Sequence, residues 1–225
     1  MAEPLPSTVF LRLLGLPLER LEYFLELMDG IIRPQELGAT DEKAARAAAG
    51  QKIYALFEEA IDSRLADPTD DLLTWMIGEE VDGQKLTREQ ILDICYLLLI
   101  AGLDTVTASL DTFVAYFGQH PERRRMAVER PQMLDGVIEE LLRHESPVVG
   151  VPRVVIQEVT LSGVTLKPGE KATLLIGAAN SDEAGFSGAD QVDFERRPNR
   201  HLAFGGGPHR CLGSHLARME LREAL

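Results

Sequence analysis

The sequence predicts a mainly α-helical protein with one small β-sheet, that is, an α+β fold. Three observations support this fold class. Residues 1–145 place apolar side chains at helical spacing and are divided by prolines. Residues 148–177 are rich in Val, Thr and Ile and contain glycine turns, which is the pattern of short strands. Residues 201–225 join a glycine-rich loop to a last helical segment.

The first third of the chain is expected to hold several helices separated by turns. Pro17 and Pro34 interrupt the first apolar segments, because proline breaks a helix interior. An alanine-rich stretch follows, and Pro68 ends it. The predicted helices cover residues 9–14, 19–32, 41–65 and 70–77, and residues 81–85 form a linker around an Asp82-Gly83 turn.

The longest predicted helix covers residues 87–117. Thr87 and Gln90 have the spacing of a capping box at its start, and Gly118 and Pro121 end it. Its roughly 31 residues correspond to about 46 Å of helix at about 1.5 Å per residue. The first half is apolar nearly all round, so we expect this helix at the centre of the fold.

The remainder of the chain changes from helices to a small sheet and then to loops. Turns at Gly163 and at Pro168-Gly169 divide the predicted strands of residues 148–177. Residues 178–200 are polar and irregular, and residues 201–225 contain a loop followed by a helix from Ser214. The other predicted helices cover residues 121–129 and 131–145.

Composition narrows the classes of protein that this chain fits. A net charge of −13 argues against general binding to nucleic acids or anionic membranes, although residues 195–225 hold six Arg against three Glu. The longest apolar run, Ile94–Leu103, falls short of the roughly 20 residues of a membrane span. Two cysteines and a start without a secretory pattern favour a reducing cytoplasm.

The segment from Phe204 to Gly213 carries the strongest chemical signal. It lacks the Gly-Lys-Ser/Thr of a phosphate loop and the third glycine of a dinucleotide fingerprint. Cys211 and His215 are only two of the four ligands that a structural zinc ion needs. His209 is too close in sequence to activate Cys211 as a nucleophile.

What remains is a thiolate on a glycine loop at a helix N-terminus, where the helix dipole stabilises an anion. Glycines on both sides let a flat partner lie against the backbone, which suggests haem with a thiolate ligand. The ordinary alternative is a glycine-rich turn with a buried cysteine. The segment Phe204-Gly205-Gly206-Gly207-Pro208-His209-Arg210-Cys211-Leu212-Gly213 resembles the haem-binding loop of cytochromes P-450, F-x-x-G-x-H/R-x-C-x-G, at every defined position.

This resemblance implies haem b with Cys211 as its axial iron ligand. It implies that Phe204, Gly205, His209 and Gly213 belong to the haem-binding loop.

A second motif lies in the long helix. Ala101-Gly102-Leu103-Asp104-Thr105 resembles the family's oxygen-binding signature, A/G-G-x-D/E-T. A glycine inside a helix costs about 1 kcal/mol relative to alanine, and the resemblance implies that Gly102 leaves room for O2. Thr105 would then hydrogen-bond the oxygen and Asp104 would relay protons. The ordinary alternative is a threonine bonded back to its own helix.

A third motif, Glu140-Leu141-Leu142-Arg143, matches the family's E-x-x-R. By spacing alone, Glu139 is an equally good partner for Arg143. The resemblance implies a structural role completed by an arginine before the cysteine loop, for which Arg196 is preferred to Arg197.

The resemblance also implies cations for the haem propionates. Arg153, after the E-x-x-R helix, and His209 match the family's positions, with a surface strand arginine and a loop histidine as the alternatives. Residues 148–152 would line the substrate pocket, and their lack of charge indicates an apolar substrate.

Taken together, the resemblance implies a cytoplasmic haem-thiolate monooxygenase that inserts one oxygen atom from O2 into an apolar small molecule. An iron–sulfur ferredoxin would supply electrons, steered by Arg210, Arg218 and Arg222, with no nucleic-acid or membrane partner. Family domains are nearly twice as long, so residues 1–225 are expected to be one partial cytochrome P-450 domain, truncated at both ends. The alternative is a non-catalytic remnant or haem-binding module.

Overall fold

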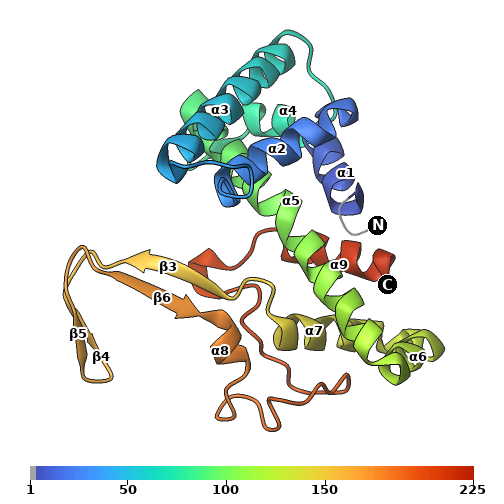
Figure 1. The fold of residues 1–225 in the computed structure, drawn as a ribbon. Helices are drawn as coiled ribbons and strands as arrows, with labels where there is room; N and C mark the ends of the chain where they lie inside the picture. Colours follow the sequence, from blue (N-terminus) through green and yellow to red (C-terminus); the bar gives the residue numbers. More distant parts are fainter. Residues whose placement is uncertain (1–3) are drawn as a thin grey trace. The chain divides into compact units, whose positions relative to one another are not determined.

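The computed structural model describes residues 4–225, and helices dominate it (Figure 1). The strands of the described residues form three short antiparallel pairs. The prediction of a mainly α-helical chain with a small amount of β-structure is therefore confirmed. The chain divides into two compact units, Met1–Thr107 and Ala108–Leu225. The long helix α5 (Arg88–Gln119) contributes residues to both units.

The first unit is built from helices around one apolar core. Its described helices are α1 (Pro4–Leu13), a 3-10 turn (Leu18–Arg20), α2 (Leu21–Ile32), α3 (Glu42–Ala66), α4 (Leu72–Gly78) and the first part of α5. Prolines and acidic caps set these ends: the Asp41 carboxylate accepts a hydrogen bond from the Ala44 amide at 3.0 Å, at the start of α3. The helix α1 begins five residues before the predicted segment 9–14, and the other helices agree with the predicted segments to within two residues.

The core of the first unit draws residues from every one of these α-helices. Phe24 of α2 and Phe57 of α3 are completely buried, as are Leu11 of α1 and Leu73 of α4. The helix α5 adds Ile91, Leu92, Cys95, Leu99 and Leu103.

The linker predicted over residues 81–85 is a small hairpin. Strands β1 (Glu80–Val81) and β2 (Gln84–Lys85) pair antiparallel around Asp82 and Gly83. Both turn residues have positive φ, 54° and 75°, as a two-residue hairpin turn requires. The turn was predicted, but the two short strands were not.

The start of α5 has the predicted capping box. The Thr87 amide donates to Gln90 Oε1 at 2.8 Å, and the Gln90 amide donates to Thr87 Oγ1 at 3.2 Å. One face of α5 is buried, but Leu97 is 64% exposed, so burial on all sides is not observed. The helix is long and apolar enough for a membrane span by length and composition, a test that core helices of soluble proteins also pass.

The second unit combines helices with two small sheets rather than the single sheet predicted. Strands β3 (Gly150–Val154) and β6 (Lys171–Leu175) form one antiparallel pair, and β4 (Val159–Leu161) and β5 (Val164–Leu166) form the other (Figure 1). The described helices are α6 (Pro121–Glu129), a 3-10 turn (Pro131–Met133), α7 (Leu134–Glu145), α8 (Ile176–Asn180), a 3-10 turn (Gly207–His209) and α9 (Ser214–Ala224). The helix α8 was not predicted.

The helix α7 lies against the irregular segment 181–200, and this contact requires a glycine. A Cβ on Gly136 would overlap the carbonyl oxygen of Phe194. Phe194 also packs edge-on against Phe117 of α5, with ring centroids 6.5 Å apart. This close approach places the irregular segment within reach of the polar side chains of α7.

Candidate functional site

Glu140 and Arg143 form a fully buried ion pair on α7. Both side chains have zero exposure. Arg143 Nε donates to Glu140 Oε2 at 2.9 Å, and Arg143 Nη2 donates to Glu140 Oε1 at 2.8 Å. This bidentate geometry is the strong form of an arginine–carboxylate interaction. Arg143 is therefore paired with Glu140 and not with Glu139, the other partner that spacing allows.

The remaining donors of Arg143 hold distant parts of the chain. Arg143 Nη1 donates to the carbonyl oxygens of Asn180 at 2.8 Å and Ala189 at 2.9 Å, and Nη2 donates to that of Gln191 at 3.0 Å. A buried guanidinium is stable only when its donors are satisfied. Arg143 thus fastens the end of α8 and the irregular segment to α7.

Arg196 completes this group, which we call the Glu140 cluster (Glu140, Arg143, Arg196 and Asn199). Arg196 Nε lies 3.1 Å from both carboxylate oxygens of Glu140, and Asn199 Nδ2 donates to Oε2 at 3.0 Å. Arg197 instead donates to the carbonyl oxygen of Arg196 at 2.8 Å. Burial acts to raise the pKa of Glu140, but the hydrogen bonds from Arg143, the Asp193 amide and Arg196 outweigh it and lower that pKa.

A second carboxylate, Glu139 of the same helix, contacts a different set of residues. Arg218 of α9 donates to it through Nε at 2.6 Å and Nη2 at 2.8 Å. His201 Nε2 lies 3.0 Å from Glu139 Oε2. Burial opposes ionisation, yet hydrogen bonds from Arg218 and His201 lower the pKa of Glu139 to about 2. We call Glu139, His201 and Arg218 the Glu139 cluster.

The cysteine loop lies between His201 and α9. The Cys211 amide donates to the Phe204 carbonyl oxygen at 2.8 Å, which closes the loop on itself. Gly205 and Gly207 have φ of 65° and 62°, in the left-handed region that favours glycine. Cys211 is a free, exposed cysteine three residues before α9 begins.

The donor set of this loop fits a haem. A Cβ on Gly206, Gly207 or Gly213 would meet nothing within 4 Å, so the backbone is open to a flat ring. Among the described residues, the structure contains no group of three or more His, Cys, Asp or Glu side chains able to hold a metal ion, and a haem iron needs only one thiolate from this side. Cys211 is the one cysteine of this loop.

Cations for the propionates are also available in this unit. Arg153 on β3 and His209 in the loop are both exposed. Arg153 Nη1 donates to the neighbouring Pro152 carbonyl oxygen at 2.9 Å. Neither side chain belongs to the buried Glu140 cluster.

The oxygen-binding motif lies on α5 in the first unit. The Thr105 hydroxyl donates to the Ala101 carbonyl oxygen at 2.9 Å, the bond back to its own helix that was the ordinary alternative. The Asp104 carboxylate pairs with Arg33, which also binds Asp29 at 2.6 Å. These acidic partners raise the pKa of Arg33, with the Asp104 hydrogen bond as the largest cause.

Close packing explains why a glycine occupies position 102 of α5 in this structure. A Cβ there would lie 2.6 Å from Cε2 of the Phe10 ring. The space beside Gly102 is therefore filled by the Phe10 ring in this structure. The physical reason is that an apolar ring gains more from contact with a bare helix backbone than from exposure to water.

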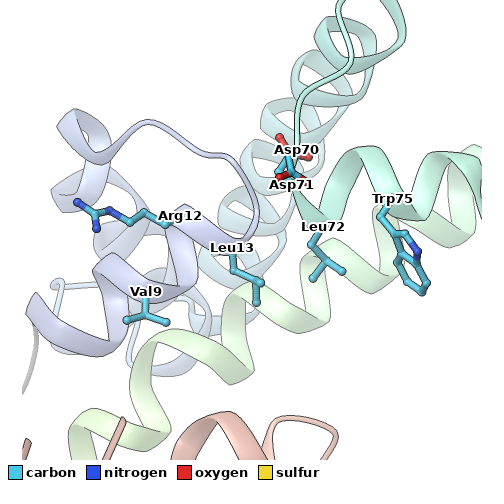
Figure 2. A pocket seen from close by; sticks show the side chains of 7 residues that line it. All are labelled: Val9, Arg12, Leu13, Asp70, Asp71, Leu72 and Trp75. Carbon is cyan, nitrogen blue, oxygen red and sulfur yellow. The ribbon is translucent and has the colours of Figure 1, made fainter. Parts of the chain in front are cut away.

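One hollow in the first unit has a volume of about 610 Å³ and lies apart from the predicted site residues. Trp75 and Leu72 of α4 and Val9 and Leu13 of α1 line its sides, with charged groups from Arg12 and the segment before α4 (Figure 2). None of the residues predicted from the motifs lines it.

Sequence reasoning missed part of this site. His201 received no role, and Glu139 was considered only as an alternative partner of Arg143. Asn180 was not singled out, yet its side chain accepts from the Leu202 amide at 2.7 Å and donates to Ser146 at 2.9 Å. The tandem Glu139-Glu140 was the one available signal, since two adjacent carboxylates on a helix face different neighbours.

These observations agree with the comparison to known protein families. The cytochrome P450 family model matches residues 37–225. The chain therefore belongs to the cytochrome P450 family, and this membership implies a haem cofactor.

Individual relatives are bacterial cytochromes P450. The chain is 37% identical over 226 residues to the mycinamicin IV hydroxylase/epoxidase of Micromonospora griseorubida, a match that covers 100% of this chain and 56% of that protein. The structure of the cytochrome P450 PksS from the bacillaene polyketide synthase of Bacillus subtilis superposes with a TM-score of 0.91 at 32% identity, covering 100% of this chain and 57% of that one.

A second solved structure is P450BioI in complex with an acyl carrier protein ligated to hexadec-9Z-enoic acid. It has a TM-score of 0.89 at 35% identity, and the match covers 100% of this chain and 58% of that one. The chain thus spans a little over half the length of the relatives that it matches.

Proposed function

We propose that this chain is part of a haem-thiolate monooxygenase in which Cys211 is the axial ligand of the iron. The observation that carries the proposal is a free, exposed cysteine on a glycine loop, closed by the bond between the Cys211 amide and the Phe204 carbonyl oxygen. The Glu140 and Glu139 clusters support it, because they fasten the segments on both sides of that loop to α7.

The overall reaction would place one oxygen atom of O2 into a C–H bond of the substrate and release the other as water. Two electrons and two protons must come from outside the substrate. A thiolate-ligated haem, when bound, supplies the activation of O2. The chain's own residues supply the ligand, the anchors for the propionates and the protons.

Each predicted residue has a role within this proposal. Cys211 holds the iron, and Arg153 and His209 bind the propionates as cations. Glu140, Arg143 and Arg196 keep the segment before the loop in place.

The oxygen motif would handle the protons. The Thr105 hydroxyl holds a proton at Oγ1, and the Asp104 carboxylate, held by Arg33, passes protons from solvent toward it. Ala101 and Gly102 form the surface of α5 beside them, and Phe10 must leave Gly102 for O2 to lie there.

The proposed substrate is an apolar small molecule. Residues 148–152 carry no charged side chain before Arg153, and Val149 is 66% exposed. Among the relatives, one is named a mycinamicin IV hydroxylase/epoxidase, and the P450BioI structure holds an acyl carrier protein ligated to hexadec-9Z-enoic acid. The cytoplasm is the proposed compartment, as expected for a chain with two free cysteines.

The proposed electron donor is an acidic iron–sulfur ferredoxin that binds beside the thiolate. Arg218 and Arg222 are engaged by Glu139 and Asp135, so their charges are partly compensated. Arg210, exposed and next to Cys211, is therefore the main candidate for steering the donor. Reduction of the haem form should slow as ionic strength rises, and Arg210→Glu should slow it further.

The second candidate function is a haem-binding module without turnover. It is favoured by the Phe10 ring that fills the space beside Gly102. Both candidates use Cys211 as the ligand, and product formation from an apolar substrate separates them.

The direct test is the absorption spectrum of the ferrous–CO form of the purified chain after haem is added. A red-shifted thiolate-type Soret band is expected, and Cys211→Ala should abolish it. Cys95→Ala is the matched control, because Cys95 is buried in the first unit and should leave the band unchanged. Retention of the thiolate-type band in Cys211→Ala would overturn the proposal.

A further inference from the structure

The two ends of the cysteine loop are tied to a single carboxylate. His201, just before the loop, and Arg218, in the helix after it, both contact Glu139 of α7. The side chain of His201 is 3% exposed, and those of Glu139 and Arg218 are 26% and 29% exposed. The Glu139 cluster is thus sheltered enough for its ion pairs to be stronger than ordinary surface pairs.

The hydrogen bonds of His201 assign its proton. The Ala203 amide donates to His201 Nδ1 at 3.2 Å, so this nitrogen is an acceptor and carries no hydrogen. The hydrogen lies on Nε2, which donates to Glu139 Oε2 at 3.0 Å. The imidazole ring therefore joins the backbone at the start of the loop to Glu139.

Arg218 contacts the loop as well as the carboxylate. Its guanidinium carbon lies 4.3 Å from the centroid of the Phe204 ring, a cation–π contact. Its Nη1 donates to the Ser214 carbonyl oxygen at 3.1 Å, in the first turn of α9. The carbonyl oxygen of Phe204 also accepts a hydrogen bond from the Cys211 amide. Phe204 therefore connects Arg218 to the backbone of Cys211.

Electrostatics supports the same connection. The pKa of Arg218 is raised above its usual value, chiefly by the hydrogen bonds to Glu139, against the opposing effect of burial.

We propose that Glu139, His201 and Arg218 are positioning residues that hold both ends of the cysteine loop on one carboxylate and set the orientation of the Cys211 thiol. The effect on the haem rests on the proposed function, in which Cys211 binds the iron. The clamping of the loop by the Glu139 cluster does not depend on it.

The chain offers a matched control for this proposal. Arg222 of α9 pairs with Asp135 of α7, so it joins the same two helices as Arg218 and Glu139. These side chains are 50% and 75% exposed, and neither has a described contact with residues 201–213. If the Glu139 cluster only joined α7 to α9, Arg218→Lys and Arg222→Lys would have similar effects.

The first experiment measures hydrogen exchange of the loop amides in the haem-free chain. Arg218→Lys and Glu139→Gln should speed exchange of the Cys211 amide at least tenfold, because Lys cannot bind both carboxylate oxygens and Gln is uncharged. Arg222→Lys should change it less than twofold. The proposal would be overturned if Arg218→Lys and Glu139→Gln changed the exchange no more than Arg222→Lys does, or if none of the three changed it.

Phe204→Leu is the second variant, for the case in which Arg218→Lys does not fold. It removes the ring contacted by Arg218 and leaves both ion pairs of the Glu139 cluster intact. The Cys211 amide should again exchange faster, whereas far-UV circular dichroism should match that of the wild type. Unchanged exchange in a folded Phe204→Leu chain would also overturn the proposal.

The second experiment records the ferrous–CO spectrum of the same variants after haem is added. Arg218→Lys should lose at least half of the thiolate-type band, and Arg222→Lys should keep it. A thiolate-type band that persists in Cys211→Ala would defeat the proposed function but leave the exchange result valid. If exchange of the Cys211 amide is unchanged in Arg218→Lys and Glu139→Gln while Cys211→Ala still loses the band, only the proposal for the Glu139 cluster is defeated.

Discussion

Arg143 has no exposed surface, and its substitution tests how the second unit is held together. Arg143→Met keeps most of the apolar stem but removes the bidentate partner of the buried Glu140 carboxylate. Breaking a buried ion pair from one side costs about 3–5 kcal/mol, because a charge remains buried without its partner. Arg196 and Asn199 still contact Glu140, which reduces this cost.

A second contribution comes from the backbone carbonyl groups that Arg143 satisfies. Those of Asn180, Ala189 and Gln191 lose a donor, at about 1 kcal/mol each where water does not replace it. We therefore expect Arg143→Met to lower the free energy of unfolding by about 3–5 kcal/mol in total. This is a large part of the roughly 5–15 kcal/mol that stabilises a typical protein.

The assay is urea denaturation followed by far-UV circular dichroism. With a slope of about 2–3 kcal/mol per molar urea, the midpoint should fall by about 1–2.5 M. Arg222→Met is the control, because its exposed pair with Asp135 should contribute less than about 1 kcal/mol. A loss below about 1 kcal/mol for Arg143→Met would refute the reasoning that this pair holds the irregular segment on α7.

Two further predictions concern pH and packing. The folded-state pKa of Glu139, about 2, lies below its usual value of 4.5, so its ionised form stabilises the fold above about pH 4.5 and this stability is lost as pH falls toward 2. Unfolding free energies measured across this range should converge for the wild type and Glu139→Gln, and parallel curves would contradict the assignment. Gly102→Ala should destabilise the chain by about 1–3 kcal/mol through overlap with Phe10, and Phe10→Leu should restore part of the loss in the double variant. Thermal unfolding measures this, and additive effects of the two substitutions would argue against the contact.

Local features of the fold could be read from the sequence. The capping box of Thr87 and Gln90, the proline breaks and the Asp82-Gly83 turn depend on residues a few positions apart, so the printed order is enough. The motif around Cys211 was also predictable, because its chemistry depends on residue types at fixed spacing. Family membership followed from those motifs and is shown by the family match.

The sequence did not show which residues contact each other in the folded chain. Spacing allowed Arg143 to pair with either Glu139 or Glu140, and burial against residues 180–199 selects Glu140. The contact of the Phe10 ring from α1 with Gly102 could not be read from the sequence either. The sheet was expected to be single, whereas backbone pairing divides it into two.

The sequence by itself determined the helices other than α8, the cysteine loop and the family, because these depend on local spacing and residue type. Only the tertiary structure decided that Glu139 gathers His201 and Arg218, residues 62 and 79 positions away, around the cysteine loop. The physical reason is that a sheltered carboxylate must collect donors from whichever segments pack beside it. Those segments are brought together by the burial of α7, which no short stretch of sequence specifies.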